Sequence, residues 1–87
     1  MPKLSVAKGL KSALPTNTVH QHREDLGLSK VDLAKRAKLS DKTIARVERS
    51  EKRFRSVTYR RIFNALNKAR REEGLAELVY EQVFPQE

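Results

Sequence analysis

The stretch LSKVDLAKRAKLSDKTIARVER, residues 28–49, carries two helix-start signals. Ser29, with an aspartate three residues later, is a capping signature that precedes a helical apolar pattern. Ser40 can cap a second helix, in which Ile44 and Val47 form a narrow apolar stripe. Helices this short bury too little surface to be stable alone, so they must pack on flanking helices. The stretch therefore predicts two short helices joined by a tight turn inside a larger helical domain.

The outward face of the second predicted helix is basic. The side chains left off its apolar stripe are Asp41, Lys42, Thr43, Ala45, Arg46 and Arg49. Every long side chain among them except that of Asp41 carries a positive charge. A helix that hides one apolar face and shows a basic one suits insertion into the major groove of DNA.

Several short motifs occur in a characteristic order and spacing. They are Arg23-Glu24, Gly27-Leu28-Ser29, Asp32-Leu33-Ala34, Leu39-Ser40, Thr43-Ile44, Arg46-Val47-Glu48-Arg49 and the helical segment 58–66. Together they resemble the Cro/lambda-repressor (XRE) helix-turn-helix family over about half of the chain. The resemblance implies an all-α domain of four or five helices that binds double-stranded DNA and reads its sequence.

The resemblance assigns base reading to the second helix of the pair. The residues concerned are Asp41, Lys42, Thr43 and Arg46. Arg46 can contact guanine O6 and N7 with two hydrogen bonds, and Lys42 can do so less rigidly. Asp41 could accept a hydrogen bond from cytosine or simply offset the helix dipole. The side chains expected at DNA phosphates are Ser29, Lys30, Arg49, Lys52, Arg53 and Arg55.

The resemblance also has structural implications. It pairs Arg23 with Glu48 in a buried ion pair, although each could instead be solvated separately. Lys38 and Ser50 stand where the family usually has glycine, so the turn and the helix end are expected to differ slightly from its pattern. Phe54 is expected to plug the core beside the basic loop.

The whole-chain composition limits the possible functions. With 87 residues the chain has room for one small core, and it has no cysteine. Its net charge of +8 and pI of about 10.2 indicate a polyanionic partner. There is no apolar run of about 20 residues and no signal-peptide core, so we expect a soluble protein in the cytoplasm, associated with a bacterial nucleoid.

Catalysis, metal binding and cofactors are not expected. The two histidines, His20 and His22, are two residues apart, which does not suit a metal pair on a helix. Acidic pairs occur only at adjacent positions, and there is no phosphate-binding glycine loop. We therefore expect neither an enzyme nor a membrane protein.

The chain divides into three predicted segments. Residues 1–17 are a basic arm that either follows the DNA backbone or is a frayed terminus. Residues 18–73 are the helix-turn-helix domain, with a first helix near 18–26 and a last one near 56–71. Residues 74–87 are an apolar, acidic tail, either a strand or an extended piece with a helical turn. The tail could fold over its own core or contact another protein chain.

The sequence favours a small transcriptional repressor that acts as a homodimer. One alternative is an antitoxin that uses the same fold on its operator and binds a toxin protein with a terminal segment. The other is an interaction module that does not read DNA sequence. The scarcity of aromatic residues on the predicted surface argues against single-stranded nucleic acid, which proteins usually hold by stacking.

Overall fold

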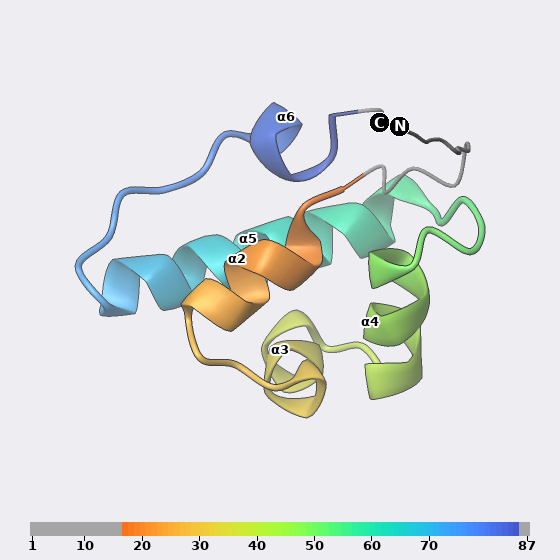
Figure 1. Ribbon diagram of the computed structural model, residues 1–87, viewed down its shortest axis with the longest axis horizontal. Coiled ribbons are helices and arrows are strands. Elements are labelled where there is room, and N and C mark those ends of the chain that lie inside the picture. The colour runs from red at the N-terminus through yellow and green to blue at the C-terminus, as the bar shows by residue number, and fades with distance from the viewer. Residues whose placement is uncertain (1–16, 86–87) are drawn as a thin grey trace, which may run out of the picture.

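A computed structural model describes residues 17–85, which form five helices (Figure 1). In chain order they are α2 (Val19–Asp25), α3 (Lys30–Ala37), α4 (Asp41–Glu48), α5 (Ser56–Glu72) and α6 (Tyr80–Val83). The described residues contain no strand, so the predicted all-α fold class is confirmed. The predicted N-terminal arm lies outside the described residues except for Asn17.

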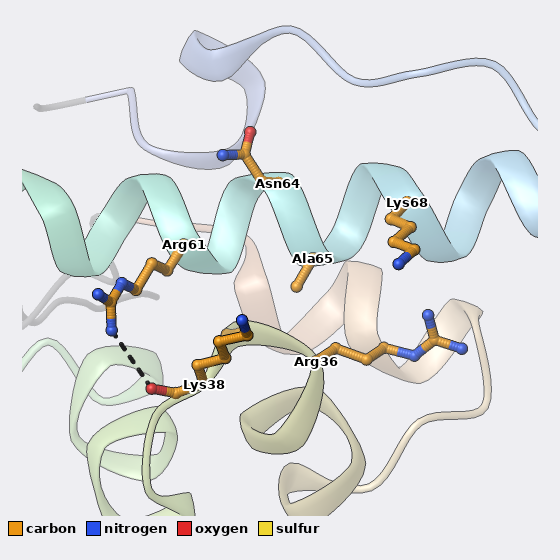
Figure 2. A pocket seen from close by; sticks show the side chains of 7 residues that line it. Arg36, Lys38, Arg61, Asn64, Ala65 and Lys68 are labelled. Atoms are coloured by element: carbon orange, nitrogen blue, oxygen red, sulfur yellow. Dashed lines mark hydrogen bonds between the residues drawn. The ribbon is translucent and has the colours of Figure 1, made fainter.

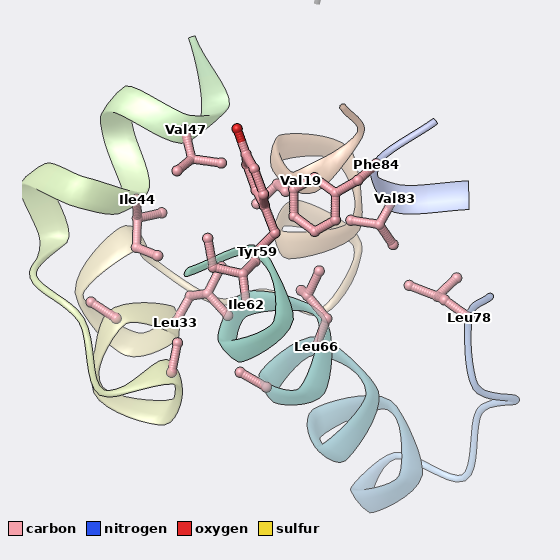
Figure 3. Packing of buried hydrophobic residues seen from close by; sticks show 13 residues of the cluster. Val19, Leu33, Ile44, Val47, Tyr59, Ile62, Leu66, Leu78, Val83 and Phe84 are labelled. Atoms are coloured by element: carbon pink, nitrogen blue, oxygen red, sulfur yellow. The ribbon is translucent and has the colours of Figure 1, made fainter. Parts of the chain in front are cut away.

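The core lies where α2, α3 and α4 meet α5. Helix α3 packs against both α4 and α5, and α2 contacts the same two helices. The residues most completely removed from solvent are Val19, Leu33, Ile44, Val47, Ile62, Leu66 and Val83. Figure 3 shows these side chains converging between the helices, together with the rings of Tyr59 and Phe84. The apolar stripes predicted for the helices are therefore the faces that they bury.

Both predicted helix starts are present. The Ser29 hydroxyl accepts from the Asp32 amide at 3.0 Å, and the Asp32 carboxylate accepts from the Ser29 amide at 3.1 Å. This second hydrogen bond holds the pKa of Asp32 below its usual value. At the next helix the Ser40 hydroxyl accepts from the Thr43 amide at 3.1 Å. These caps fix the start of α3 and the start of α4, and thereby the helix-turn-helix unit.

Four helices end in the same left-handed backbone conformation. The residues that adopt it are Gly27, Lys38, Ser50 and Gly74, with φ of 71°, 60°, 54° and 76°. In each case the next amide donates to the carbonyl five residues earlier, as in Leu39 to Ala34 at 2.9 Å and Glu51 to Arg46 at 3.2 Å. The expectation that Lys38 and Ser50 would change the helix ends is therefore wrong. These residues adopt the glycine-like conformation at a cost of about 1 kcal/mol each.

The C-terminal tail folds back over the core. Of the two conformations left open, the chain takes the extended piece followed by a helical turn, α6, and the strand alternative is wrong. Leu78, Val83 and Phe84 are all buried, and the Phe84 ring lies 4.8 Å from that of Tyr59. The tail thus completes the core of its own chain.

A buried asparagine holds the extended part of the tail. The Asn67 side-chain amide donates to the Leu78 carbonyl at 3.1 Å, and its oxygen accepts from the Leu78 amide at 2.7 Å. Further along, the Thr18 amide donates to the Val83 carbonyl at 3.0 Å. The beginning and the end of the described chain therefore lie side by side, as Figure 1 shows. Sequence reasoning missed Asn67, because its partner is backbone eleven residues away.

Candidate nucleic-acid interface

Helix α4 has one buried and one exposed face. Ile44 and Val47 are 0% and 1% exposed, so the predicted apolar stripe is buried. Lys42, Arg46 and Arg49 are exposed. Their spacings of four and three residues place these three cations on one side of the helix. The result is a short basic ridge held in place by the core beneath it.

The first turn of α4 has two further polar side chains. Asp41 is exposed and lies at the helix N-terminus, where its charge offsets the helix dipole. Thr43 is half-buried, and its hydroxyl lies 2.9 Å from that of Ser40. The Thr43 hydroxyl is therefore already engaged in the cap of the helix before any ligand is present.

An acidic side chain accompanies the basic ridge. Arg49 Nε donates to Glu51 Oε2 at 2.7 Å, and Arg46 Nε lies 4.0 Å from Glu51 Oε1. All three side chains are substantially exposed, at 54% for Arg46, 62% for Arg49 and 43% for Glu51. Glu51 thus partly neutralises both arginines in the free protein. Sequence reasoning missed this role, although Glu51 is the single acid in the loop 50–55.

The predicted phosphate-contacting residues fall in two places. Ser29 and Lys30 are at the start of α3, where Lys30 is exposed and Ser29 is engaged in the capping box. Lys52, Arg53 and Arg55 lie in the loop between α4 and α5. The half-buried Phe54 anchors this loop. The Phe54 backbone amide donates to the Tyr59 hydroxyl at 3.0 Å, and the Lys52 ammonium lies 5.2 Å from the centre of the Phe54 ring.

A buried ion pair connects α2 to the end of α4. Arg23 Nε donates to Glu48 Oε2 at 2.6 Å, and both side chains are nearly inaccessible, at 7% and 5% exposed. Arg23 Nη1 also donates to the Leu28 carbonyl at 2.8 Å. The hydrogen bond to Glu48 raises the pKa of Arg23 above its ordinary value, so the guanidinium stays charged. The pair expected from the resemblance is therefore formed, and it fixes the direction in which α4 leaves the core.

A second connection to α4 comes from Asn17. Its side-chain amide donates to the Val47 carbonyl at 2.8 Å and lies 3.4 Å from the Ser50 hydroxyl. Its oxygen accepts from the Val19 amide at 3.1 Å, at the start of α2. The role of Asn17 in holding the end of α4 could not be seen from local sequence, because Val47 is 30 residues away.

A family model described as a helix-turn-helix domain matches residues 17–75. The chain belongs to the helix-turn-helix family. This assignment is consistent with the resemblance found in the sequence, and it supports a DNA-binding regulatory role for the helix-turn-helix protein in general. No curated protein and no solved structure matches the chain.

Two findings concern other kinds of site. Within residues 17–85, no helix is long and apolar enough to cross a membrane. The same residues contain no cluster of three or more histidine, aspartate or glutamate side chains that could bind a metal ion. The helix-turn-helix match and the exposed cations of α4 make the basic surface around that helix the candidate functional site.

Proposed function

We propose that the protein is a sequence-specific regulator that binds double-stranded DNA and acts as a small transcriptional repressor. The observation that carries the proposal is the two-faced α4, with Ile44 and Val47 buried and Lys42 and Arg46 exposed. An α-helix is about 10–12 Å across with its side chains, and the major groove of B-DNA is about 12 Å wide. The exposed face of α4 would therefore reach the edges of the bases.

The exposed face of α4 suits direct base reading. Arg46 can donate two hydrogen bonds to guanine, and Lys42 can approach the same acceptors. Asp41 can accept from cytosine N4, and Thr43 can contact thymine or a phosphate. Affinity would come mainly from phosphate contacts, which position the protein without reading sequence. We assign these contacts to Ser29, Lys30, Arg49, Lys52, Arg53 and Arg55.

The operator would be read by two copies of the chain. Helix α4 has eight residues and is therefore about 12 Å long, which covers only a few base pairs. A homodimer doubles the contacts and reads two half-sites about one helical turn, ~34 Å, apart. Because the two copies would be related by two-fold symmetry, we expect a palindromic or nearly palindromic operator.

The test is selection from a pool of randomised duplex DNA, followed by affinity measurements at two salt concentrations. We expect a palindrome to be recovered. The five cations assigned to phosphates would give a slope of log K against log salt of about −4 to −5 per protomer. Binding without sequence preference would reject base reading and favour the interaction module.

A variant pair locates the reading surface. Lys42→Ala with Arg46→Ala should abolish the preference for the selected site over random DNA, because it removes both guanine-contacting groups. The matched control is Lys35→Ala with Arg60→Ala, which removes the same charges from exposed positions on α3 and α5. An unchanged preference in the α4 variant would show that another surface reads the DNA.

The antitoxin alternative rests on the surface of the tail. Leu75 and Val79 are 45% and 58% exposed beside the acidic Glu77, so the tail offers apolar and acidic groups to a partner. Under this alternative, a toxin encoded beside this gene would be neutralised by the wild-type protein. A Leu75→Ser, Val79→Ser variant should then fail to neutralise the toxin while it still binds DNA.

A further inference from the structure

A basic groove lies between α3 and α5, outside the interface described above. Its volume is about 360 Å³. The residues that line it are Arg36, Ala37, Lys38, Arg61, Asn64, Ala65 and Lys68. Figure 2 shows Arg61 and Lys68 on α5 along one side of this groove, with Arg36 and Lys38 facing them from the end of α3. Among residues 17–85, no acidic residue lines the groove.

Most of the cationic side chains in the groove form no ion pair within the part of the chain that the structure describes. Arg36 pairs with Glu72, with Nη2 and Oε1 2.9 Å apart. Within residues 17–85, no carboxylate lies within ion-pair distance of Lys38, Arg61 or Lys68. The hydrogen bond that Arg61 makes is to the Lys38 carbonyl, at 3.4 Å. Lys38, Arg61 and Lys68 line the same groove and together create a positive potential that attracts an anion, although the charge of Lys68 also acts on Glu72.

The edge of the groove already holds one carboxylate. Glu72 comes from the end of α5, and the hydrogen bond from Arg36 is the main cause that holds the pKa of this carboxyl below its usual value. The charges of Arg36, Lys68 and Arg71 act in the same direction. The cations around Glu72 therefore favour the ionised form of its carboxyl group.

The shape of the groove selects an extended ligand. Ala37 and Ala65, the small residues in its lining, are almost completely buried, while long cationic side chains project around them. Arg61 and Lys68 are seven residues apart on α5, which corresponds to about 10 Å along the helix. An extended peptide covers that distance in about three residues.

Duplex DNA fits this groove poorly. Packed helices are about 8–10 Å apart, so the space between their exposed side chains is narrow. A peptide side chain can enter such a space. The phosphates of duplex DNA lie on the broad convex surface of the double helix, which contacts protruding side chains and does not enter a narrow groove. We propose that the groove between α3 and α5 binds an extended acidic segment of a partner protein, whose carboxylates pair with Lys38, Arg61 and Lys68. This partner site is independent of the DNA-binding function proposed above.

The proposal is tested with a synthetic ten-residue peptide that has glutamate at every third position, titrated into ¹⁵N-labelled full-length protein. Amide NMR shifts should move saturably at residues 36–38 and 61–68. A peptide with glutamine at the same positions should bind at least tenfold more weakly. Arg61→Gln with Lys68→Gln should weaken the acidic peptide about tenfold, since each exposed ion pair contributes up to about fivefold.

The control variant removes the same charges from α4. Lys42→Gln with Arg46→Gln should change peptide affinity by less than twofold, and Arg61→Gln with Lys68→Gln should leave binding to duplex DNA within twofold. Peptide shifts centred on α4, or no saturable shifts, would overturn the proposal. It would equally fail if the groove variant weakened DNA binding as much as the α4 variant, because the groove would then be a DNA surface. Wild-type shift mapping decides the matter even if the groove variant does not fold.

Discussion

Replacing Arg23 with glutamine should destabilise the domain more than any surface charge change. The Arg23 guanidinium donates to Glu48 at 2.6 Å and 3.2 Å and to the Leu28 carbonyl at 2.8 Å. Glu48 is 5% exposed, so loss of the Arg23 guanidinium leaves a buried carboxylate with only the His20 ring nitrogen, 3.3 Å away, near its Oε1 atom. Removing one member of a buried ion pair costs about 3–5 kcal/mol. For a domain of this size that loss corresponds to a fall in Tm of at least about 12 °C.

The matched control is Arg36→Gln. Arg36 also pairs with a glutamate at 2.9 Å, but the two side chains are 32% and 49% exposed. Exposed pairs contribute about 0–1 kcal/mol because solvent screens both charges. The same substitution should therefore have a several-fold smaller effect at Arg36 than at Arg23. The difference between the two variants isolates the effect of burial from that of losing an arginine.

Urea denaturation of Arg23→Gln, Glu48→Gln and the double variant gives the coupling energy directly. We expect a coupling of at least about 2 kcal/mol, since the double variant removes both charges and leaves two amides that can bond each other. If Arg23→Gln cost less than about 1 kcal/mol, the ion pair would not be what holds α4 against α2. Other contacts, such as those of Asn17 with Val47, would then set the direction of α4.

Three further substitutions test single contacts. Lys38→Gly should stabilise the domain by up to about 1 kcal/mol in urea denaturation, because glycine adopts the left-handed conformation at φ 60° without strain. Glu51→Gln should tighten DNA binding in a fluorescence anisotropy titration, because it frees Arg49 of a counter-ion that competes with phosphate. Asn67→Leu should cost about 2 kcal/mol or more in urea denaturation, since it leaves the buried amide and carbonyl of Leu78 without partners.

Each of these substitutions has a control in the same chain. Lys35→Gly, inside α3, should destabilise by about 1 kcal/mol, the opposite sign to Lys38→Gly. Glu77→Gln also removes an exposed acid paired with an arginine, yet it should leave DNA affinity almost unchanged if binding is confined to the α4 surface. Asn64→Leu changes an exposed asparagine of the same helix and should have little effect on stability. Equal effects in a pair would contradict the corresponding argument.

Local signals in the sequence predicted most of the fold. The Ser29 and Ser40 caps depend on residues three positions apart, and the apolar stripes depend on helical spacing, so both could be identified from short windows. The left-handed turns at Lys38 and Ser50 were not predicted, because both residues stand where the family usually has glycine and left-handed backbone is unfavourable for other residues. Tertiary packing determined the backbone there, since a change of turn would move α4 away from its place on the core.

Long-range partners could not be predicted in the same way. Asn67 looks like an ordinary polar residue on a helix until the tail lies against it, and Asn17 is 30 residues from the Val47 carbonyl that it bonds. The Arg23–Glu48 pair was expected only through the family resemblance, since 25 residues separate its members. Glu51 is different, because it is close in sequence to the arginines that it neutralises. Its pairing with Arg46 and Arg49 could therefore have been predicted from the sequence.

The packing of the tail constrains how two copies could pair. Leu78, Val83 and Phe84 are buried in the core of their own chain and are not available for an interface between chains. The large apolar side chains still exposed in residues 17–85 are Val31, Val57, Leu75 and Val79. Each is already about half covered, and an interface of roughly 800 Å² per partner also buries polar surface, so these side chains could supply only the apolar part of a dimer contact. In the described part of the chain, the homodimer that we propose would therefore need polar contacts between its copies, and the two half-sites of its DNA would help to bring the copies together.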